Sequence, residues 1–212
     1  MGNNMFAYCG NNPVRNVDVT GMACYDVLWN WANTIAGALN PTSKISAVGA
    51  LGVAALQGRW SDIQSDWNNG CLNPFNQSED IAMKSKVLSF YKGSTVVRQD
   101  IIGTSSFCGT IWAETSIDET TLKHEYGHSI QERLMGPRFI STVGIPSVAY
   151  YCYDYSTGGK TIDYYSTPWE RTADWLGRVD RKCGYKSGAL AWGIAENVLG
   201  PVVIPWYLLF GY

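Results

Sequence analysis

The first third of the chain carries hydrophobic positions with the length and spacing of helices. Residues 25–39 and 45–57 are rich in apolar side chains, and the polar stretch 40–43 separates them. This pattern predicts two helices before residue 58. Asn, Gly, Pro and Ser then dominate residues 68–78, which predicts a loop and a boundary between two modules.

Beyond this loop the pattern changes from helical to strand-like. A short helix is predicted over residues 78–85, with Ser78 as its N-terminal cap. Residues 87–91 and 95–101 are rich in aromatic and β-branched side chains and flank a Lys-Gly-Ser turn, which predicts a β-hairpin. A further strand is predicted over residues 107–113. Helices and strands together indicate the α+β class.

A clearly delimited helix is predicted after the last strand. A capping box over residues 116–119 marks its start, with Asp118 or Thr120 as the alternative cap. Gly136 and Pro137 mark its end. Apolar residues recur every four positions between these limits and predict a buried stripe. The stripe consists of Leu122, Tyr126, Ile130 and Leu134.

Composition sets broad limits on the class of protein. With 212 residues, of which 46% are hydrophobic, the chain can form one domain, alone or with an appendage. The charged fraction is 16% and the net charge is −2, so no broad basic surface for nucleic acid is expected. Six cysteines without a C-x-x-C pair argue against a structural zinc knuckle, and free buried thiols are favoured over disulfides. These cysteines are Cys9, Cys24, Cys71, Cys108, Cys152 and Cys183.

The apolar stretches are too short to cross a bilayer. Residues 45–56 and 198–212 both fall below the ~20 residues that a spanning helix needs. We interpret them as a core helix and a packed C-terminal tail, with membrane contact during delivery as the alternative. No signal peptide is expected at residues 1–12, which lack a charged start followed by an apolar run.

The sequence HEYGH at residues 124–128 contains the only two histidines of the chain. On a helix, residues four apart share one face, so the rings of His124 and His128 can point at one metal ion. Glu125 lies about 100° further around the helix, where it can act on a water molecule without ligating the metal. Because this helix is the one delimited above, the spacing predicts a zinc site.

Two histidines leave a tetrahedral zinc site short of one protein ligand. The best candidate is Glu170, on a helix predicted to start after Pro168. Asp174 follows four residues later on the same face and can accept the free ring N–H of a ligating histidine. Other acidic and thiol groups remain alternatives for the third ligand. These are Glu196, Asp163, Cys152 and Cys183.

Two further groups of side chains lie near the predicted ligands in sequence. Tyr164 and Tyr165, and also Tyr151, precede Glu170 and are candidate donors to an oxyanion. A basic cluster follows the acidic pair and is interpreted as a solvated helix face, with docking of an acidic substrate segment or an immunity protein as the alternative. The cluster consists of Arg171, Arg178, Arg181, Lys182 and Lys186.

The HExxH sequence followed by E-x-x-x-D at residues 170–174 resembles the gluzincin branch of zinc peptidases. This resemblance implies a zincin-like fold, in which a small sheet packs on the HExxH helix and a second helix carries the third ligand. It also implies that residues 107–113 form the edge strand that pairs with the substrate backbone. Zn²⁺ would be held by His124, His128 and Glu170, with Glu125 as the general base.

Residues 6–22 resemble the closing segment of the Rhs/YD-repeat core, through Asn-Asn-Pro, the following Asp and the final Gly. The segment departs from the family at Val19, where proline is usual. The resemblance implies that residues 1–22 are the core tail. Together with the boundary at the loop over residues 68–78, it predicts a mostly helical linker or pro-like region over 23–77 and a peptidase domain over 78–212. The C-terminal module that follows such a core is a toxin.

The expected function is that of a zinc metallopeptidase acting as the effector domain of an Rhs-type polymorphic toxin, secreted and delivered to a target cell. The expected partners are a protein or peptide substrate, an immunity protein and the Rhs core shell, without nucleic acid. Two alternatives stay open at this point. One is a non-enzymatic binding or translocation module, and the other is a zinc amidase acting on a non-protein amide.

Overall fold

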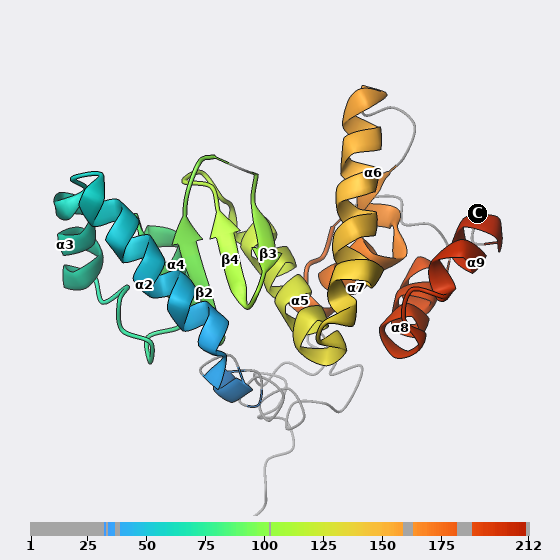
Figure 1. Cartoon of the computed structure of the whole chain (residues 1–212), viewed down its shortest axis with the longest axis horizontal. Coiled ribbons are helices and arrows are strands. Elements are labelled where there is room, and N and C mark those ends of the chain that lie inside the picture. The colour runs from blue at the N-terminus through green and yellow to red at the C-terminus, as the bar shows by residue number, and fades with distance from the viewer. Residues whose placement is uncertain are drawn as a thin grey trace, which may run out of the picture.

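The computed structural model describes residues 32, 34–36, 39–101, 103–158, 163–181 and 188–210 (Figure 1). The predicted Rhs-like segment and most of the first predicted helix lie outside these residues, as do Cys9, Cys24 and Cys183. Helices outnumber strands, and a small mixed sheet lies near the middle of the chain (Figure 1). The predicted α+β class is confirmed.

Four short strands form the sheet in the order β1-β2-β4-β3. They are β1 Leu88–Tyr91, β2 Ser94–Arg98, β3 Ser105–Phe107 and β4 Thr110–Ala113. The pairs β1–β2 and β3–β4 are antiparallel, and β2–β4 is parallel. The predicted hairpin is confirmed as β1 and β2, although β2 ends at Arg98 and not at Ile101.

The prediction of one strand over residues 107–113 is wrong. Cys108 and Gly109 have positive φ angles of 55° and 69°, so the chain reverses there. Two consecutive residues with positive φ make the tight turn that joins antiparallel strands. As a result β3 lies at one edge of the sheet, and β4 lies inside the sheet between β3 and β2.

Helix α2 (Pro41–Leu56) packs on the β1–β2 side of the sheet. Asn40 caps it, since its side chain accepts a hydrogen bond from the backbone N–H of Thr42. Its buried residues share a hydrophobic cluster with the sheet, so the packing continues across the module boundary predicted near residue 77. The buried members are Ala47, Ala54, Val87, Leu88 and Val97.

The interpretation of residues 45–56 as a core helix needs correction. The sheet covers one face of α2, and the buried side chains on that face are small. Several larger apolar side chains of α2 are exposed to solvent. These are Ile45, Val48, Val53 and Leu56.

Two short helices connect α2 to the sheet. They are α3 (Trp60–Asn68) and α4 (Glu79–Lys84). The predicted cap of α4 is confirmed, because Ser78 Oγ accepts a hydrogen bond from the backbone N–H of Ile81. Asp66 of α3 is fully buried and accepts hydrogen bonds from three successive backbone N–H groups at residues 86–88, which fixes the start of β1.

Helix α5 (Glu119–Met135) carries the two histidines and lies against the sheet. Asp118 is its cap, with Oδ1 accepting a hydrogen bond from Thr121 N, and Gly136 ends it. Leu122, Tyr126 and Ile130 form the predicted buried stripe, whereas Leu134 is 51% exposed. Each step of four residues turns a helix by about 40° beyond a full turn, so Leu134 lies about 120° away from Leu122.

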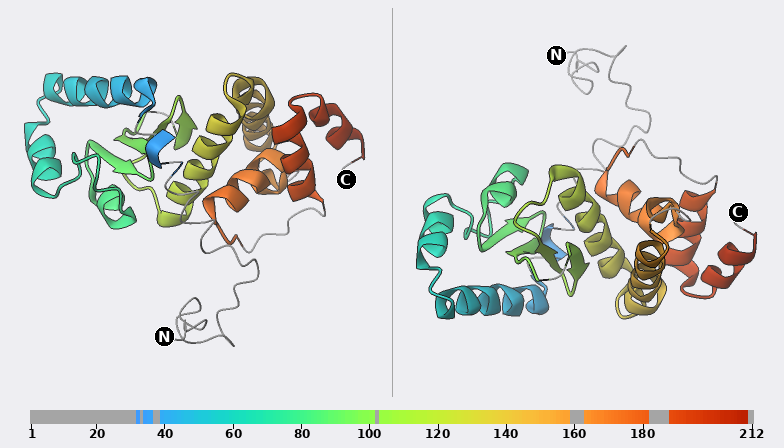
Figure 2. Two further views of the ribbon diagram at one scale, coloured as in Figure 1. Left: turned by 90° about the horizontal axis from the view of Figure 1, so that it is seen from below. Right: turned by 90° about the horizontal axis from the view of Figure 1, so that it is seen from above.

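The C-terminal half is helical. A π-helical turn, η2 (Ile140–Gly144), leads into α6 (Ile145–Ser156), and the 3-10 turn η3 (Tyr164–Ser166) precedes α7 (Pro168–Gly177). Helices α8 (Ala189–Leu199) and α9 (Val203–Phe210) follow. Helix α7 packs between α5 and α8, as the views in Figure 2 agree. The histidine helix is therefore covered by the sheet on one side and by α7 on the other.

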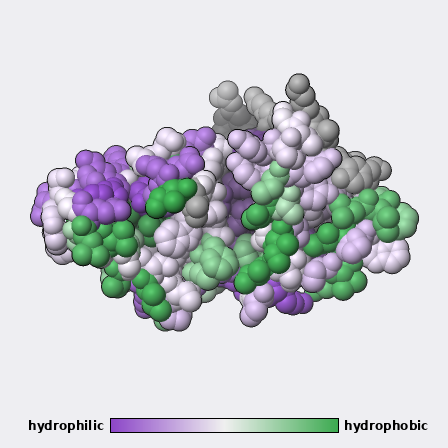
Figure 3. All heavy atoms as spheres, turned by 45° about the horizontal axis from the view of Figure 1, so that its top comes forward, coloured by the Kyte–Doolittle hydropathy of each residue, from purple (hydrophilic) through white to green (hydrophobic). Residues whose placement is uncertain are grey.

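The C-terminal stretch is only partly packed, contrary to the interpretation of a packed tail. Val203 and Tyr207 of α9 are buried, but Trp206, Leu209 and Phe210 are exposed. Apolar side chains reach the surface at several places in the molecule (Figure 3). Among the described helices, none combines the length and the apolar character needed to cross a bilayer.

The described cysteines are free thiols. Cys71 is buried, Cys108 is half-buried and Cys152 is exposed. The expectation of free thiols therefore holds for these three, and the expectation of burial fails for Cys152, which lies on the solvent side of α6.

Candidate metal centre

Helices α5 and α7 approach each other closely because glycines face backbone atoms. A Cβ atom on Gly127 would overlap the carbonyl oxygen of Ala173, and one on Gly177 would overlap the carbonyl oxygen of Lys123. The contacts advance by four residues along α5 and retreat by four along α7, so the two helices are antiparallel. This close approach brings the side chains beside the glycines into contact across the interface.

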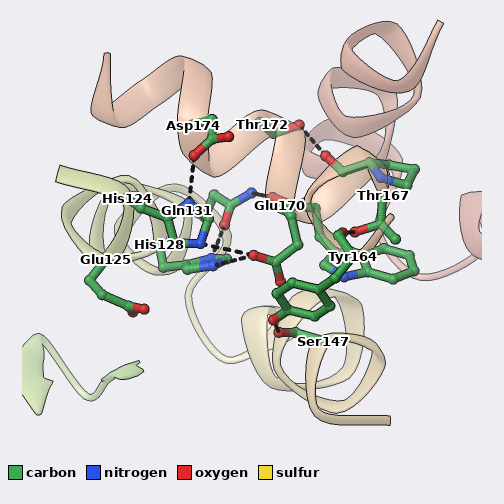
Figure 4. A network of polar contacts seen from close by, with 12 residues as sticks. His124, Glu125, His128, Gln131, Ser147, Tyr164, Thr167, Glu170, Thr172 and Asp174 are labelled. Atoms are coloured by element: carbon green, nitrogen blue, oxygen red, sulfur yellow. Dashed lines mark hydrogen bonds and ion pairs between the residues drawn. The ribbon is translucent and has the colours of Figure 1, made fainter. Parts of the chain in front are cut away.

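Two histidines and a glutamate meet beside this row of glycines. Nε2 of His124 lies 2.9 Å from Oε2 of Glu170, and Nε2 of His128 lies 3.2 Å from the same oxygen. The three side chains are buried, and one ligand atom from each lies within 4.8 Å of the other two. Figure 4 shows the rings from α5 and the carboxylate from α7 directed toward one another. This group could hold a metal ion.

The far side of each imidazole is also engaged. Nδ1 of His124 lies 2.7 Å from Oδ1 of Asp174, the residue predicted to accept a ring N–H. Nδ1 of His128 lies 2.7 Å from Oε1 of Gln131 (Figure 4). Sequence reasoning missed Gln131, although its position three residues after His128 places it on the same face of the helix. With both Nδ1 atoms occupied, both Nε2 atoms are left to face Glu170.

The three side chains fit the donor set of a divalent metal such as zinc. Two imidazole nitrogens and one carboxylate oxygen are ligands that zinc takes in proteins. Oε1 of Glu170 is buried and has no hydrogen-bond partner within the part of the chain that the structure describes. A buried carboxylate oxygen without a partner is costly, and a bound cation would satisfy it.

The charges around His124, His128 and Glu170 also favour a cation between these three side chains. Burial by itself lowers the pKa of His124, but hydrogen bonds to Asp174 and Glu170 outweigh burial and raise this pKa to about 10. Burial by itself also lowers the pKa of His128, but the negative charge of Glu170 outweighs burial and raises this pKa. Burial would raise the pKa of Glu170, yet the two histidines hold it well below its usual value. The carboxylates thus attract positive charge, which protons or a metal ion can supply.

Glu125, the predicted base, directly follows His124 in the sequence and is buried. Figure 4 shows no hydrogen bond or ion pair between Glu125 and the other side chains drawn. Its Oε2 atom has no hydrogen-bond partner among the described residues. Burial raises the pKa of Glu125, against the opposing effect of His128 and His124. A buried carboxylate with an elevated pKa has the properties of a general base.

Two of the three candidate tyrosines, Tyr164 and Tyr165, lie close to the candidate ligands. The hydroxyls of Tyr164 and Ser147 are 2.6 Å apart, and Figure 4 shows Tyr164 beside Glu170. The ring of Tyr165 packs edge-on against His124, with ring centres 5.4 Å apart. The Tyr151 ring lies further away and packs against Tyr164, with centres 6.1 Å apart. Burial and then the charge of Glu170 raise the pKa of Tyr164, which keeps its hydroxyl protonated.

Arg181 belongs to the surroundings of the site, so the interpretation of a solvated helix face is wrong for this residue. Its Nε atom lies 3.1 Å from Oδ1 of Asp174, and its guanidinium lies 3.8 Å from the centre of the Tyr165 ring. Helix α7 ends at Gly177, so the chain beyond it is free to fold back over Asp174. Arg178 is exposed, and Lys182 and Lys186 lie outside the described residues.

The alternative third ligands do not join this group in the described structure. Glu196 is buried on α8, where burial and the charge of Glu170 raise its pKa to about 9. Asp163 is exposed just before η3, Cys152 is exposed on α6, and Cys183 lies outside the described residues. Within the described ranges, Glu170 is therefore the acidic residue that meets both histidines.

Comparisons with protein-family models, with curated proteins and with solved structures find no match for this chain.

Proposed function

We propose that the protein is a zinc-dependent metallopeptidase with a zincin-like fold. The observation that carries the proposal is the meeting of His124, His128 and Glu170 in one buried group, next to the unpartnered carboxylate of Glu125. Two of the proposed metal ligands and the proposed proton-transfer residue thus lie within one short stretch of α5. A helix pair that served stability alone would gain little from burying so many ionisable groups.

Zinc is the metal that these donors suit best. Catalytic zinc sites use three protein ligands, often two histidines and a glutamate, and keep a further position open. When bound there, zinc would lower the pKa of a water molecule and polarise the scissile carbonyl. His124, His128 and Glu170 would hold the ion, and the partners at each Nδ1 would keep both rings in the tautomer that ligates through Nε2.

The chain's own residues supply the proton transfers. Glu125 would remove a proton from the attacking water and then deliver it to the leaving amine, as its elevated pKa allows. Tyr164 and Tyr165 are the candidate donors to the carbonyl oxygen as negative charge develops on it. Both have raised pKa values and hence protonated hydroxyls.

The sheet offers a place for an extended substrate. Strand β3 is an edge strand close to α5, since Oγ of Ser106 and Oγ of Ser129 are 2.7 Å apart. The turn after β3 is fixed to the same helix by a hydrogen bond from Gly109 N to Glu132 Oε2. An edge strand can pair with a peptide backbone, which supports hydrolysis of peptide bonds.

The biological setting that we propose is that of an effector domain of an Rhs-type polymorphic toxin. The support is the resemblance of residues 6–22 to the end of an Rhs core, followed by a module with the side chains of a hydrolase. In this setting the full-length protein would carry an Rhs shell, and the producing cell would hold an immunity protein. The substrate would be a protein or peptide of the target cell.

A Glu125→Gln variant tests the proposed activity. The change removes the base but touches none of the three ligand side chains, so zinc content should stay at the wild-type value. Hydrolysis of a denatured-protein library should fall by at least ~100-fold, the lower range for loss of a general base. Cleavage of peptidoglycan instead of protein would favour an amidase, and unchanged toxicity of the variant would favour a binding module.

A further inference from the structure

We propose that Gln131 is a positioning residue of the metal centre, which orients His128 and ties it to the backbone that carries Glu170. This inference rests on the proposed zinc site and concerns how the chain prepares it. The Gln131 side chain is fully buried in α5, three residues after His128. A buried amide makes hydrogen bonds on both its oxygen and its nitrogen. Here one bond joins Gln131 to His128, and the other joins it to the backbone of Trp169, the residue before Glu170.

The amide oxygen determines the tautomer of His128. Oε1 of Gln131 lies 2.7 Å from Nδ1 of His128, and an amide oxygen can only accept a hydrogen bond. Nδ1 must therefore carry a proton, whether the ring is neutral or charged. In the neutral ring this leaves the lone pair on Nε2, the atom that lies 3.2 Å from Glu170.

The amide nitrogen determines which way the amide points. Nε2 of Gln131 donates a hydrogen bond to the carbonyl oxygen of Trp169 at 2.9 Å, and a carbonyl can only accept. Trp169 is fully buried and directly precedes Glu170 on α7. A single side chain thus connects the ring of one ligand to the backbone next to another, so their separation is fixed within the protein itself.

The two imidazoles are held by different chemistry. Asp174 presents a carboxylate to His124 and shares it with Arg181. Gln131 presents a neutral amide to His128, in a place already crowded by the carboxylates of Glu125 and Glu170. An ionised carboxylate at position 131 would have no proton to donate to the carbonyl oxygen of Trp169. An amide can both accept a hydrogen bond from His128 and donate one to Trp169.

The test compares Gln131→Met with Ser129→Ala in the full chain. Methionine fills nearly the same volume but makes neither hydrogen bond, so zinc affinity measured by chelator competition should fall by about 10–100-fold. The visible absorption of the Co²⁺-loaded variant should change shape as well. Ser129 is equally buried on α5. Its hydroxyl contacts Ser106 and donates to the backbone carbonyl of Glu125, and it bonds to no ligand side chain. Ser129→Ala should therefore lower the unfolding temperature while zinc affinity and the Co²⁺ spectrum keep their wild-type values.

If Gln131→Met does not fold, a measurement on the wild type tests the positioning role of Gln131. The chain has only two histidines, so ¹⁵N-histidine labelling of the zinc-loaded protein gives two sets of ring signals. Both rings should carry a slowly exchanging Nδ1 proton. A His128 ring whose Nδ1 exchanges freely with water, or a Gln131→Met variant with wild-type zinc affinity, would overturn the proposal.

These outcomes are separate from those of the proposed function. A wild-type protein that binds no zinc would refute the metallopeptidase and the role of Gln131 together. A protein that binds zinc but cleaves no peptide bond would refute the peptidase alone, because the affinity ratio between wild type and Gln131→Met decides the role of Gln131 without any activity measurement.

Discussion

The two faces of α5 are held in different ways. Toward the sheet, Leu122, Tyr126 and Ile130 pack in an apolar cluster that includes Val96 and Ile111. Toward α7, the same helix presents glycine, histidine and glutamine, whose contacts are hydrogen bonds and close backbone approaches. Apolar packing is non-directional, whereas a ligand group depends on the direction and distance of each atom. Stability and chemistry should therefore respond differently to substitutions on opposite sides of one helix.

This contrast predicts that the α7 face tolerates less change in volume than the sheet face. A cavity on the apolar side costs stability, but the surroundings can relax into it. A methyl group added to Gly127 on the α7 side would overlap a backbone carbonyl of α7, and this carbonyl can move only if the whole helix moves. The following substitutions compare the two faces.

Gly127→Ala should have the largest effect. Its Cβ atom would overlap the Ala173 carbonyl, so α5 and α7 must separate and the ligand atoms with them. We expect zinc affinity to fall by more than ~100-fold, beyond the usual effect of losing one supporting contact. Gly49→Ala in the interior of α2 is the matched control, because nothing lies within 4 Å of its Cβ position. Wild-type zinc affinity in Gly127→Ala would show that the helix spacing does not set the site.

Ile130→Ala tests the opposite face. The side chain is buried against the sheet, so its truncation should reduce the free energy of unfolding by about 2–5 kcal/mol. The folded variant should still bind a single zinc ion per chain, because no ligand contact changes. Urea unfolding and metal analysis measure the two quantities. Leu134→Ala on the same helix, where the side chain is half-exposed, should change stability by less than ~1 kcal/mol.

Asp174→Asn should have a smaller effect on the site than Gly127→Ala. The amide can still accept the His124 N–H, but it loses the charge that Arg181 and the ring share. Isothermal titration with zinc should show an affinity about 10–100-fold lower. Asp180→Asn, an exposed residue shortly after α7, is the control and should bind zinc like the wild type. An unchanged affinity in Asp174→Asn would mean that the charge at this position does not support the metal.

Glu196→Gln should have the smallest effect on the metal site, and its effect on stability should depend on pH. Because the folded pKa of Glu196 is raised to about 9 from 4.5, its contribution to stability is complete below pH 4.5 and is lost as pH rises toward 9. The variant cannot ionise, so its stability relative to the wild type should rise over this window and be greater at pH 8 than at pH 5. Urea unfolding at pH 5 and pH 8 measures the difference, and an equal difference at both pH values would contradict the raised pKa.

The sequence predicted the features that depend on short spacings. The cap at Ser78 and the hairpin of β1 and β2 follow from local rules, and the structure has them. The cap of α5 is Asp118, which was the alternative to a capping box that starts at Ser116. The i, i+4 spacing of His124 and His128 likewise places both rings on one face of α5. These features need only the chain within a few residues, so tertiary packing does not override them.

Features that depend on packing were not predicted. The reversal at Cys108 was missed because a non-glycine residue adopts positive φ there. Gln131 and Arg181 gain their roles from contacts with groups 38 and 7 residues away, respectively, and neither residue belongs to a motif. The exposure of Ile45 depends on how much of α2 the sheet covers, which hydrophobic periodicity does not encode.

The central claim, that His124, His128 and Glu170 converge on one divalent cation, is tested most directly by equilibrium dialysis against Zn²⁺. Wild type should be compared with Glu170→Gln, and with Glu119→Gln as a control, since Glu119 is an exposed acid on the same helix as the histidines. We predict a single tightly held zinc ion per chain in the wild type and in Glu119→Gln, and its loss in Glu170→Gln. A wild type without zinc, or a Glu170→Gln variant that binds zinc as tightly, would contradict the account.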